Sequence, residues 1–173
     1  MAIRVGINGF GRIGRNILRA MIQRNENLEV VAINDLDDPK ALGHLFKYDS
    51  VHRTFGASVA VAGTDLVVGG KTIKVTAEKD PRKLPWKELG VDYVIESTGV
   101  FRKLAQLEQH LSAGARRVIL TVPCKDPLAA TLVMGVNDHV VNGDTRIISN
   151  ASCTTNCAAP LVKVLHDTFG VKR

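Results

Sequence analysis

The chain has 173 residues, of which 45% are hydrophobic and 23% are charged, a composition ordinary for a globular protein. Its length suits one well-packed domain rather than a minimal one. No apolar run approaches the ~20 residues of a membrane span, and no N-terminal secretory signal is visible. Three cysteines without framework spacing argue against a disulfide-stapled secreted domain. We therefore expect a protein of the reducing cytoplasm.

The positive net charge leaves two classes of partner open. The 23 basic and 17 acidic residues give a charge of +6, which suits either nucleic acid or phosphorylated cofactors and substrates. The lysines and arginines are scattered, and aromatic residues make up only 5% of the chain. That is little for a base-stacking platform. Nucleic-acid binding is therefore the weaker alternative.

A βαβ unit opens the chain. Residues 3–7 form an apolar run that ends at Asn8-Gly9, as a buried strand does. Apolar residues then recur at helical spacing over residues 11–24. Residues 28–33 form a second β-rich run, which ends at Asn34-Asp35. Strand, helix and strand within some thirty residues predict two parallel strands with a right-handed crossover.

The remaining sequence continues the alternation of helices and strands. A helix is expected from Pro39, and Gly69-Gly70 separates the runs 66–68 and 71–75 as a hairpin turn does. Further strands are expected at residues 93–95, 118–121, 131–134 and 146–148, with a helix near residues 104–111. The pattern predicts an α/β fold, a Rossmann-type doubly wound parallel sheet with helices on both faces.

A GxGxxG motif, residues 9–14, joins the first strand to the first helix. Gly9 allows a sharp turn, Gly11 lets the main chain approach a pyrophosphate, and Gly14 brings the helix close to the strand. Asp35 ends the second strand, where a carboxylate can bind the adenosine ribose and repel a 2′-phosphate. The unit therefore predicts NAD rather than NADP. The alternative is a structural glycine turn with Asp35 as a surface residue.

A run of small polar residues and cysteines, residues 149–157, links a strand-like segment to a helical pattern. Ser and Thr are good helix N-caps, so Cys153 is expected in the first helical turn. The unpaired N–H groups of that turn favour an anionic sulfur, which is a strong nucleophile. Cys153 is therefore a candidate for covalent catalysis on a carbonyl. No cysteine or histidine pair has zinc-ligand spacing, so no metal site is expected.

Five segments together resemble the phosphorylating glyceraldehyde-3-phosphate dehydrogenase family. The resemblance covers essentially the whole chain, and the segments occur in the expected order. They are residues 7–15 (Ile-Asn-Gly-Phe-Gly-Arg-Ile-Gly-Arg), 33–36 (Ile-Asn-Asp-Leu), 47–50 (Lys-Tyr-Asp-Ser), 96–101 (Glu-Ser-Thr-Gly-Val-Phe) and 149–157.

The resemblance implies roles for individual residues. Cys153 matches the nucleophile, with Ser152 and Thr154 beside the substrate. The implied cofactor-binding residues are Gly9, Phe10, Gly11, Arg12, Ile13, Asn34, Asp35, Lys79, Thr98, Gly99 and Thr121. The implied reaction is NAD-dependent oxidation of glyceraldehyde 3-phosphate, with inorganic phosphate, to 1,3-bisphosphoglycerate through a thiohemiacetal and a thioester. Full-length relatives are expected to be homotetramers.

The resemblance also implies that a catalytic half is missing. Residues 1–151 would be the NAD-binding domain, and residues 152–173 the first helix of a catalytic domain that is truncated after it. None of the five histidines matches the residue that activates the cysteine. His166 lies thirteen residues along the expected helix, about 20 Å from Cys153 at ~1.5 Å per residue, and the other four are read as structural.

Three readings of function therefore stay open. The leading one is the triose-phosphate dehydrogenase. Erythrose-4-phosphate dehydrogenase shares most of the motifs, and the chain taken alone could be an NAD-binding module without catalysis. Leu161, Val162, Val164, Leu165 and Phe169 form an apolar helix face whose cover is missing. We expect that helix to be disordered, to self-associate or to pack on a second polypeptide. Pro160 is expected to bend the helix without ending it.

Overall fold

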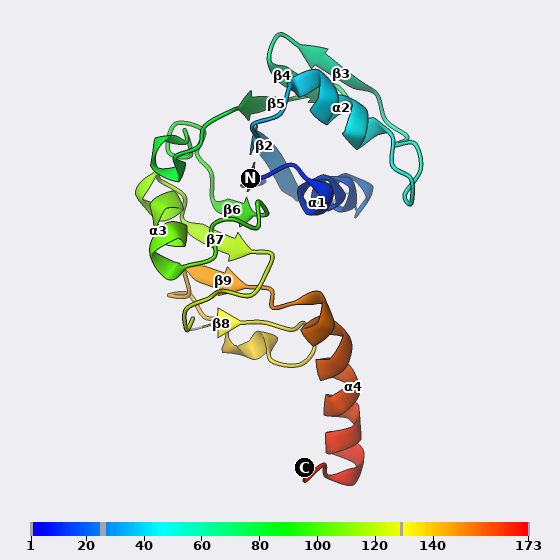
Figure 1. The fold of residues 1–173 in the computed structure, drawn as a ribbon, viewed down its shortest axis with the longest axis vertical. Coiled ribbons are helices and arrows are strands. Elements are labelled where there is room, and N and C mark those ends of the chain that lie inside the picture. Colours follow the sequence, from blue (N-terminus) through cyan, green and yellow to red (C-terminus); the bar gives the residue numbers. More distant parts are fainter. Residues whose placement is uncertain (1, 25–26, 129, 173) are drawn as a thin grey trace.

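A single mixed sheet organises the molecule, shown by a computed structural model that describes residues 2–24, 27–128 and 130–172 (Figure 1). Within those residues the sheet has nine strands. They are β1 (Ile3–Asn8), β2 (Leu28–Asn34), β3 (Val59–Ala62), β4 (Asp65–Val68), β5 (Lys71–Thr76), β6 (Tyr93–Glu96), β7 (Arg117–Leu120), β8 (Ala130–Thr131) and β9 (Ile147–Ser149). The helices are α1 (Arg12–Arg24), α2 (Pro39–Lys47), α3 (Leu104–Ser112) and α4 (Cys153–Phe169), with 3-10 turns at Pro81–Lys83 and Asp138–Val140.

The strand order is β3-β4-β5-β2-β1-β6-β7-β9-β8. Only the β3-β4-β5 meander is antiparallel, and every other neighbouring pair is parallel. From β1 the chain builds β2 to β5 on one side, and after β5 it crosses back to place β6 on the other side of β1. The strand order thus reverses beside β1, and open α/β sheets bind ligands at such a point, outside the carboxyl ends of the strands.

Alternate residues of the central strands enter two separate hydrophobic cores. In β2, Ile33 packs with residues of α1 and α2, whereas its neighbour Ala32 packs with residues of α3. In β6, Ile95 and Val94 divide in the same way. Because successive side chains of a strand point to opposite faces, the two cores lie on opposite sides of the sheet. This confirms the predicted doubly wound fold with helices on both faces.

The close packing of α1 against β1 depends on Gly14. A Cβ atom built at this position would overlap the carbonyl oxygen of Gly9 and approach Ile7 Cγ2 to 3.2 Å. Gly9 itself has a φ of 89°, a conformation that glycine adopts without steric cost. The two outer glycines of the motif therefore have the structural roles that the sequence predicted for them.

The structure differs from the sequence predictions mainly at residues 131–134, where a strand was expected. The short strand β8 ends at Thr131, because the Asn137 side chain accepts the N–H of Val133 at 2.8 Å and turns the chain. Leu132 and Val133 are nevertheless buried, so their hydrophobicity reflects core packing. Strand β3 was not predicted, and α1 begins at Arg12 rather than at residue 11.

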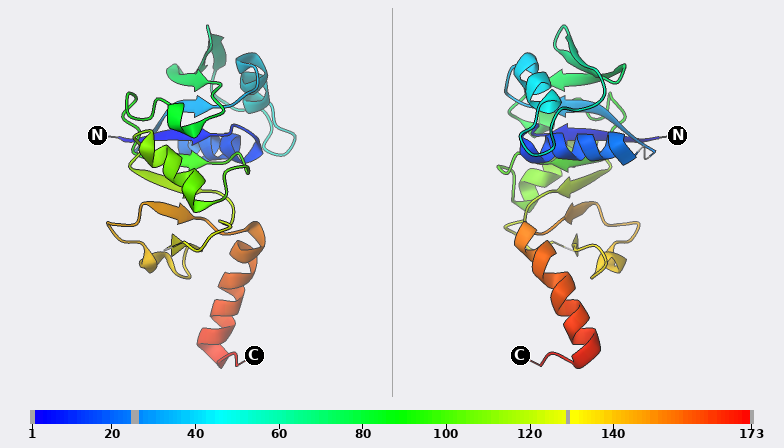
Figure 2. Two further views of the ribbon diagram at one scale, coloured as in Figure 1. Left: turned by 60° about the vertical axis from the view of Figure 1, so that its left-hand side comes forward. Right: turned by 90° about the vertical axis from the view of Figure 1, so that its right-hand side faces the viewer.

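Helix α4 projects from the end of the sheet, as the two views of Figure 2 show. It contains no buried residue, and Pro160 lies inside it without ending it. The five apolar residues of its expected face are exposed by 50% to 78%. What covers this face in the whole protein stays a prediction. No helix in the described part of the chain has both the length and the apolar character needed to cross a bilayer.

Replacing Gly14 by Ala tests the helix contact. The added methyl group would overlap the main-chain carbonyl oxygen of Gly9, which cannot rotate away, so we expect a loss of about 1–3 kcal/mol in the free energy of unfolding. Gly143→Ala is the matched control, because a Cβ there meets nothing within 4 Å, and it should change stability by less than about 0.5 kcal/mol. Urea denaturation measures both, and equal midpoints would contradict the contact.

Candidate cofactor cleft and nucleophile

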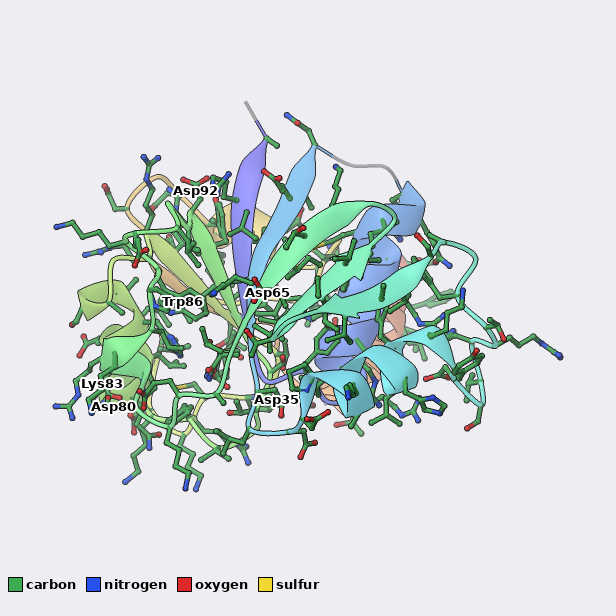
Figure 3. The ribbon with its side chains drawn as sticks, turned by 90° about the horizontal axis from the view of Figure 1, so that it is seen from above. Asp35, Asp65, Asp80, Lys83, Trp86 and Asp92 are labelled. Carbon is green, nitrogen blue, oxygen red and sulfur yellow. The ribbon has the colours of Figure 1, made fainter. Side chains whose placement is uncertain are left out.

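A cleft of about 450 Å³ opens at the carboxyl ends of β1, β2 and β6, where the strand order reverses. Figure 3 shows Asp35, which follows β2, at this edge of the sheet, and Asp92, which precedes β6, at the opposite edge. The cleft is lined by Asn8, Gly9, Gly11, Asn34, Asp35, Leu36, Glu78, Lys79, Ser97, Thr98, Val100 and Phe101. These residues lie at or just after the ends of four parallel strands, β1, β2, β5 and β6, and the topology brings them together.

Six of the eleven residues predicted to bind the cofactor line this cleft: Gly9, Gly11, Asn34, Asp35, Lys79 and Thr98. The other five do not line it. Phe10 is fully buried in the core beside Phe46, and Arg12 and Ile13 lie at the start of α1. Gly99 is an exposed loop residue next to Thr98, and the Thr121 hydroxyl donates to the carbonyl of Glu96 at 3.1 Å. Their proposed cofactor contacts stay predictions.

Asp35 is held in place by two main-chain donors. Its Oδ2 accepts the N–H of Phe10 at 2.6 Å, and its Oδ1 accepts the N–H of Asp37 at 3.1 Å. A carboxylate offers about four acceptor sites, so both oxygens keep capacity for a ribose hydroxyl. The bond to Phe10 also joins the end of β2 directly to the glycine-rich loop.

The residues of the cleft suit a dinucleotide. A Cβ at Gly11 would meet nothing within 4 Å, so the glycine-rich loop borders open space. The first N–H groups of α1 have no acceptor within the helix and can donate to an anion. These N–H groups and the exposed Lys79 can donate hydrogen bonds to an anion. The Asp35 carboxylate, elsewhere in the cleft, can accept hydrogen bonds from ribose hydroxyls. No group of three or more potential metal ligands occurs among the described residues.

The side chain of Arg12 binds protein rather than the cleft. Its guanidinium donates to Asp49 Oδ2 at 2.8 Å, while Asp49 Oδ1 accepts the N–H groups of Val51 and His52 at 2.8 and 2.9 Å. These two N–H bonds, followed by the charge and hydrogen bond of Arg12, lower the pKa of Asp49 from 3.8 to about 2. The ion pair fastens the loop after α2 to the first turn of α1.

Cys153 is the first residue of α4, as the sequence predicted. Ser152 is the N-cap, and its Oγ accepts the N–H of Thr155 at 2.9 Å. The chain turns from β9 into α4 at Ala151, which has a φ of 55°. Cys153 and Thr154 are exposed and Ser152 is half-buried. Cys153 is therefore an accessible thiol at a helix N-terminus.

The cysteine lies at the same edge of the sheet as the cleft. Strand β9 is parallel to β7, and β7 is parallel to β6, so α4 begins at the carboxyl edge. Two strand spacings of ~4.8 Å separate β9 from β6, about 10 Å in all. His166 is exposed on the last turn of α4, far from Cys153 along the same helix.

Sequence reasoning missed that several polar residues beneath the cleft are buried together, including Glu96 and His110. Glu96 and His110 are completely buried, and Asn8 and Asn34 are 1% and 5% exposed. His110 was expected to be merely structural, and Glu96 was noted only as part of a motif. The available signal was that Glu96 directly follows the three expected strand residues 93–95. A glutamate there is costly to bury without a hydrogen-bond partner, so it indicated buried polar partners.

The Asp49 interaction predicts an acid-sensitive contribution to stability. Because the pKa of Asp49 is lowered on folding, its contribution is complete above pH 3.8 and is lost as the pH falls through about 2. The free energy of unfolding of the wild type should therefore fall more steeply between pH 4 and pH 2 than that of Asp49→Asn. Denaturant titrations across this range measure the slopes, and parallel slopes would contradict the assignment.

Two family models match this chain. The model described as the NAD-binding domain of glyceraldehyde 3-phosphate dehydrogenase matches residues 3–104, and that of its C-terminal domain matches residues 152–173.

Curated relatives agree with the family models. The chain is 56% identical over 174 residues to the glyceraldehyde-3-phosphate dehydrogenase of Priestia megaterium, with 100% of this chain and 51% of that protein covered. Identity is 57% over 169 residues with the Thermotoga maritima enzyme, covering 97% and 50% of the two chains. For the Podospora anserina enzyme it is 48% over 172 residues, covering 99% and 50%. The chain thus spans about half the length of these relatives. It belongs to the glyceraldehyde-3-phosphate dehydrogenase family and carries the family's NAD-binding domain.

Proposed function

We propose that this chain binds NAD in the cleft and supplies the nucleophile for the phosphorylating oxidation of glyceraldehyde 3-phosphate in the whole protein. The observation that carries the proposal is the position of Cys153, exposed at the first residue of α4 and at the same edge of the sheet as the cleft. Residues 1–151 form the cofactor domain in this proposal, and residues 152–173 begin the catalytic domain.

The reaction centres on the sulfur of Cys153. The thiol gives up its proton and bonds to the aldehyde carbon, whose oxygen becomes the hydroxyl of a thiohemiacetal. NAD, when bound, supplies the hydride acceptor that allows this carbon to be oxidised. Loss of a hydride and of the hydroxyl proton leaves a thioester on Cys153. An oxygen of inorganic phosphate attacks the thioester carbonyl, the C–S bond breaks, and the thiolate departs from 1,3-bisphosphoglycerate.

The hydroxyl groups around Cys153 support substrate binding. Ser152 Oγ lies 2.9 Å from Thr154 Oγ1 and 2.7 Å from Thr155 Oγ1, so three hydroxyl groups gather at the N-terminus of α4. Such a group offers donors to a phosphate or a carbonyl oxygen. We assign substrate contacts to Ser152 and Thr154 on this basis.

The proposal assigns the proton acceptor for Cys153 to the second half of the whole protein. His166 is separated from the cysteine by thirteen residues of helix, about 20 Å at ~1.5 Å per residue, and a base must come within about 3 Å. The exposed apolar face of α4 would be covered by the same half, and the whole protein is proposed to be a cytoplasmic homotetramer.

Replacement of Cys153 by Ser tests the proposal. In the whole protein, NADH formation from glyceraldehyde 3-phosphate, NAD and phosphate should fall by at least ~1,000-fold, because the nucleophile is lost. Cys157→Ser is the matched control, since Cys157 is exposed one turn away on the same helix, and it should retain activity. Turnover by Cys153→Ser at the wild-type rate would refute the assignment.

Asp35 is expected to select NAD over NADP. Removing its charge in Asp35→Ser should lower NAD affinity, through loss of the ribose acceptor and of the bond to Phe10, and should relieve repulsion of a 2′-phosphate. We expect the ratio of the two dissociation constants to shift toward NADP by about tenfold, or ~1.4 kcal/mol. Asp37→Ser, an exposed neighbour, serves as the control. Calorimetric titration measures both ligands, and an unchanged ratio would exclude this role.

A further inference from the structure

A continuous series of buried polar side chains runs beneath the cleft, from Trp86 beside α3 to Asn34 at the end of β2. Trp86, His110 and Glu96 are fully buried, and Asn8 is 1% exposed. The series crosses the molecule through contacts between residues up to 88 positions apart. Because buried polar groups are costly when unpaired, each donor must meet an acceptor.

At the α3 end of the series, the hydrogen bonds can run in only one donor-to-acceptor direction. The indole N–H of Trp86 can only donate, and it lies 3.1 Å from His110 Nδ1. That nitrogen must therefore accept, which assigns the imidazole proton to Nε2. His110 Nε2 lies 3.0 Å from Glu96 Oε2, so the histidine donates to Glu96.

The β2 end is fixed in the opposite direction. The main-chain N–H of Glu78 donates to Asn34 Oδ1 at 2.8 Å, and Thr76 Oγ1 donates to the same oxygen. Asn34 Nδ2 therefore faces Asn8 Oδ1, at 2.7 Å. Asn8 in turn presents Nδ2 to Glu96 Oε2, at 2.6 Å. Flipping either side-chain amide, so that its oxygen and nitrogen exchange places, would bring two hydrogen-bond donors face to face.

A third branch reaches Glu96 from the cleft itself. The main-chain N–H of Thr98 donates to Glu96 Oε1 at 2.9 Å, and the Thr98 hydroxyl contacts the same oxygen. Four donors thus converge on one carboxyl group, two on each oxygen. Three of them, the Thr98 N–H, the Asn8 amide and His110 Nε2, can only donate here, so both oxygens of the Glu96 carboxyl group must accept.

We propose that Glu96 is a positioning residue for the cofactor. It does not line the cleft, but Asn8, Asn34 and Thr98, which its network joins, do. One buried carboxyl group thereby sets the relative positions of three strand ends that come from β1, β2 and β6. This inference rests on the proposed binding of NAD and adds a determinant of affinity for its adenosine half, because Asp35 and Asn34 lie at that part of the cleft.

Glu96→Gln is the decisive variant, because it keeps the size of the side chain and replaces one acceptor oxygen by an NH₂ donor. If the NH₂ group faces Thr98, it opposes the Thr98 N–H. If it faces the other side, it opposes Asn8 and His110, whose directions are fixed by Glu78 and Trp86. Either arrangement displaces a residue of the cleft.

The test measures binding of ADP and of NAD to the wild-type chain, Glu96→Gln and Glu108→Gln by titration calorimetry. We expect Glu96→Gln to weaken both ligands by about tenfold and by the same factor, since the loss falls on their shared adenosine part. Glu108, exposed on α3, provides the charge-matched control and should change neither affinity by more than about twofold.

Leu107→Ala distinguishes a specific positioning role of Glu96 from a general loss of stability. Leu107 is buried on α3 in the same core as Trp86, so its truncation lowers stability without altering the network. At a temperature where both variants are folded by circular dichroism, Leu107→Ala should bind ADP as the wild type does. Equal weakening by Leu107→Ala and Glu96→Gln, or unchanged binding by Glu96→Gln, would overturn the inference. A wild-type chain that binds neither ligand would instead overturn the proposed function on which it rests.

A second measurement needs no variant and applies even if Glu96→Gln does not fold. Nitrogen NMR of the wild-type chain reports which imidazole nitrogen of His110 carries the proton. The network requires a bare Nδ1 and a protonated Nε2. A proton on Nδ1, alone or together with one on Nε2, would place two donors face to face at Trp86 and would contradict the proposal.

Discussion

The fold depends on how closely α1 can approach β1. At Gly14 the helix lies so near the strand that even a methyl group would overlap the carbonyl oxygen of Gly9. This contact places the first turn of α1 at the carboxyl end of β1, beside the reversal in strand order. The cleft, the aspartate at the end of β2 and the loop after β6 are all arranged around that junction.

Two different kinds of interaction then stabilise the same edge of the sheet. The apolar side chains of β2 and β6 divide between the two faces and hold the layers together. At their last residues the strands change from apolar to polar, and Asn8, Asn34 and Glu96 pair with one another inside the sheet edge. The hydrophobic cores determine which strands are neighbours, whereas the polar groups determine how their ends are aligned.

Local sequence features predicted the elements that local chemistry governs. The glycine motif, the N-cap before Cys153 and the alternation of strands and helices were all legible in short windows, and the structure confirms them. The contacts of Glu96 could not be predicted from local sequence, because its partners lie as far as 88 residues away in the chain. The error at residues 131–134 has a related cause, since burial of Leu132 and Val133 produced a strand-like pattern in a turn.

Ala151 lies where the chain turns from β9 into α4. Its φ of 55° lies in a region that costs a residue with a Cβ roughly 1–2 kcal/mol, and the residue is nevertheless buried, with 4% exposure. A glycine would remove both the strain and the buried contacts of the alanine side chain. The chain thus enters α4, two residues before Cys153, through a packed alanine rather than through a flexible glycine.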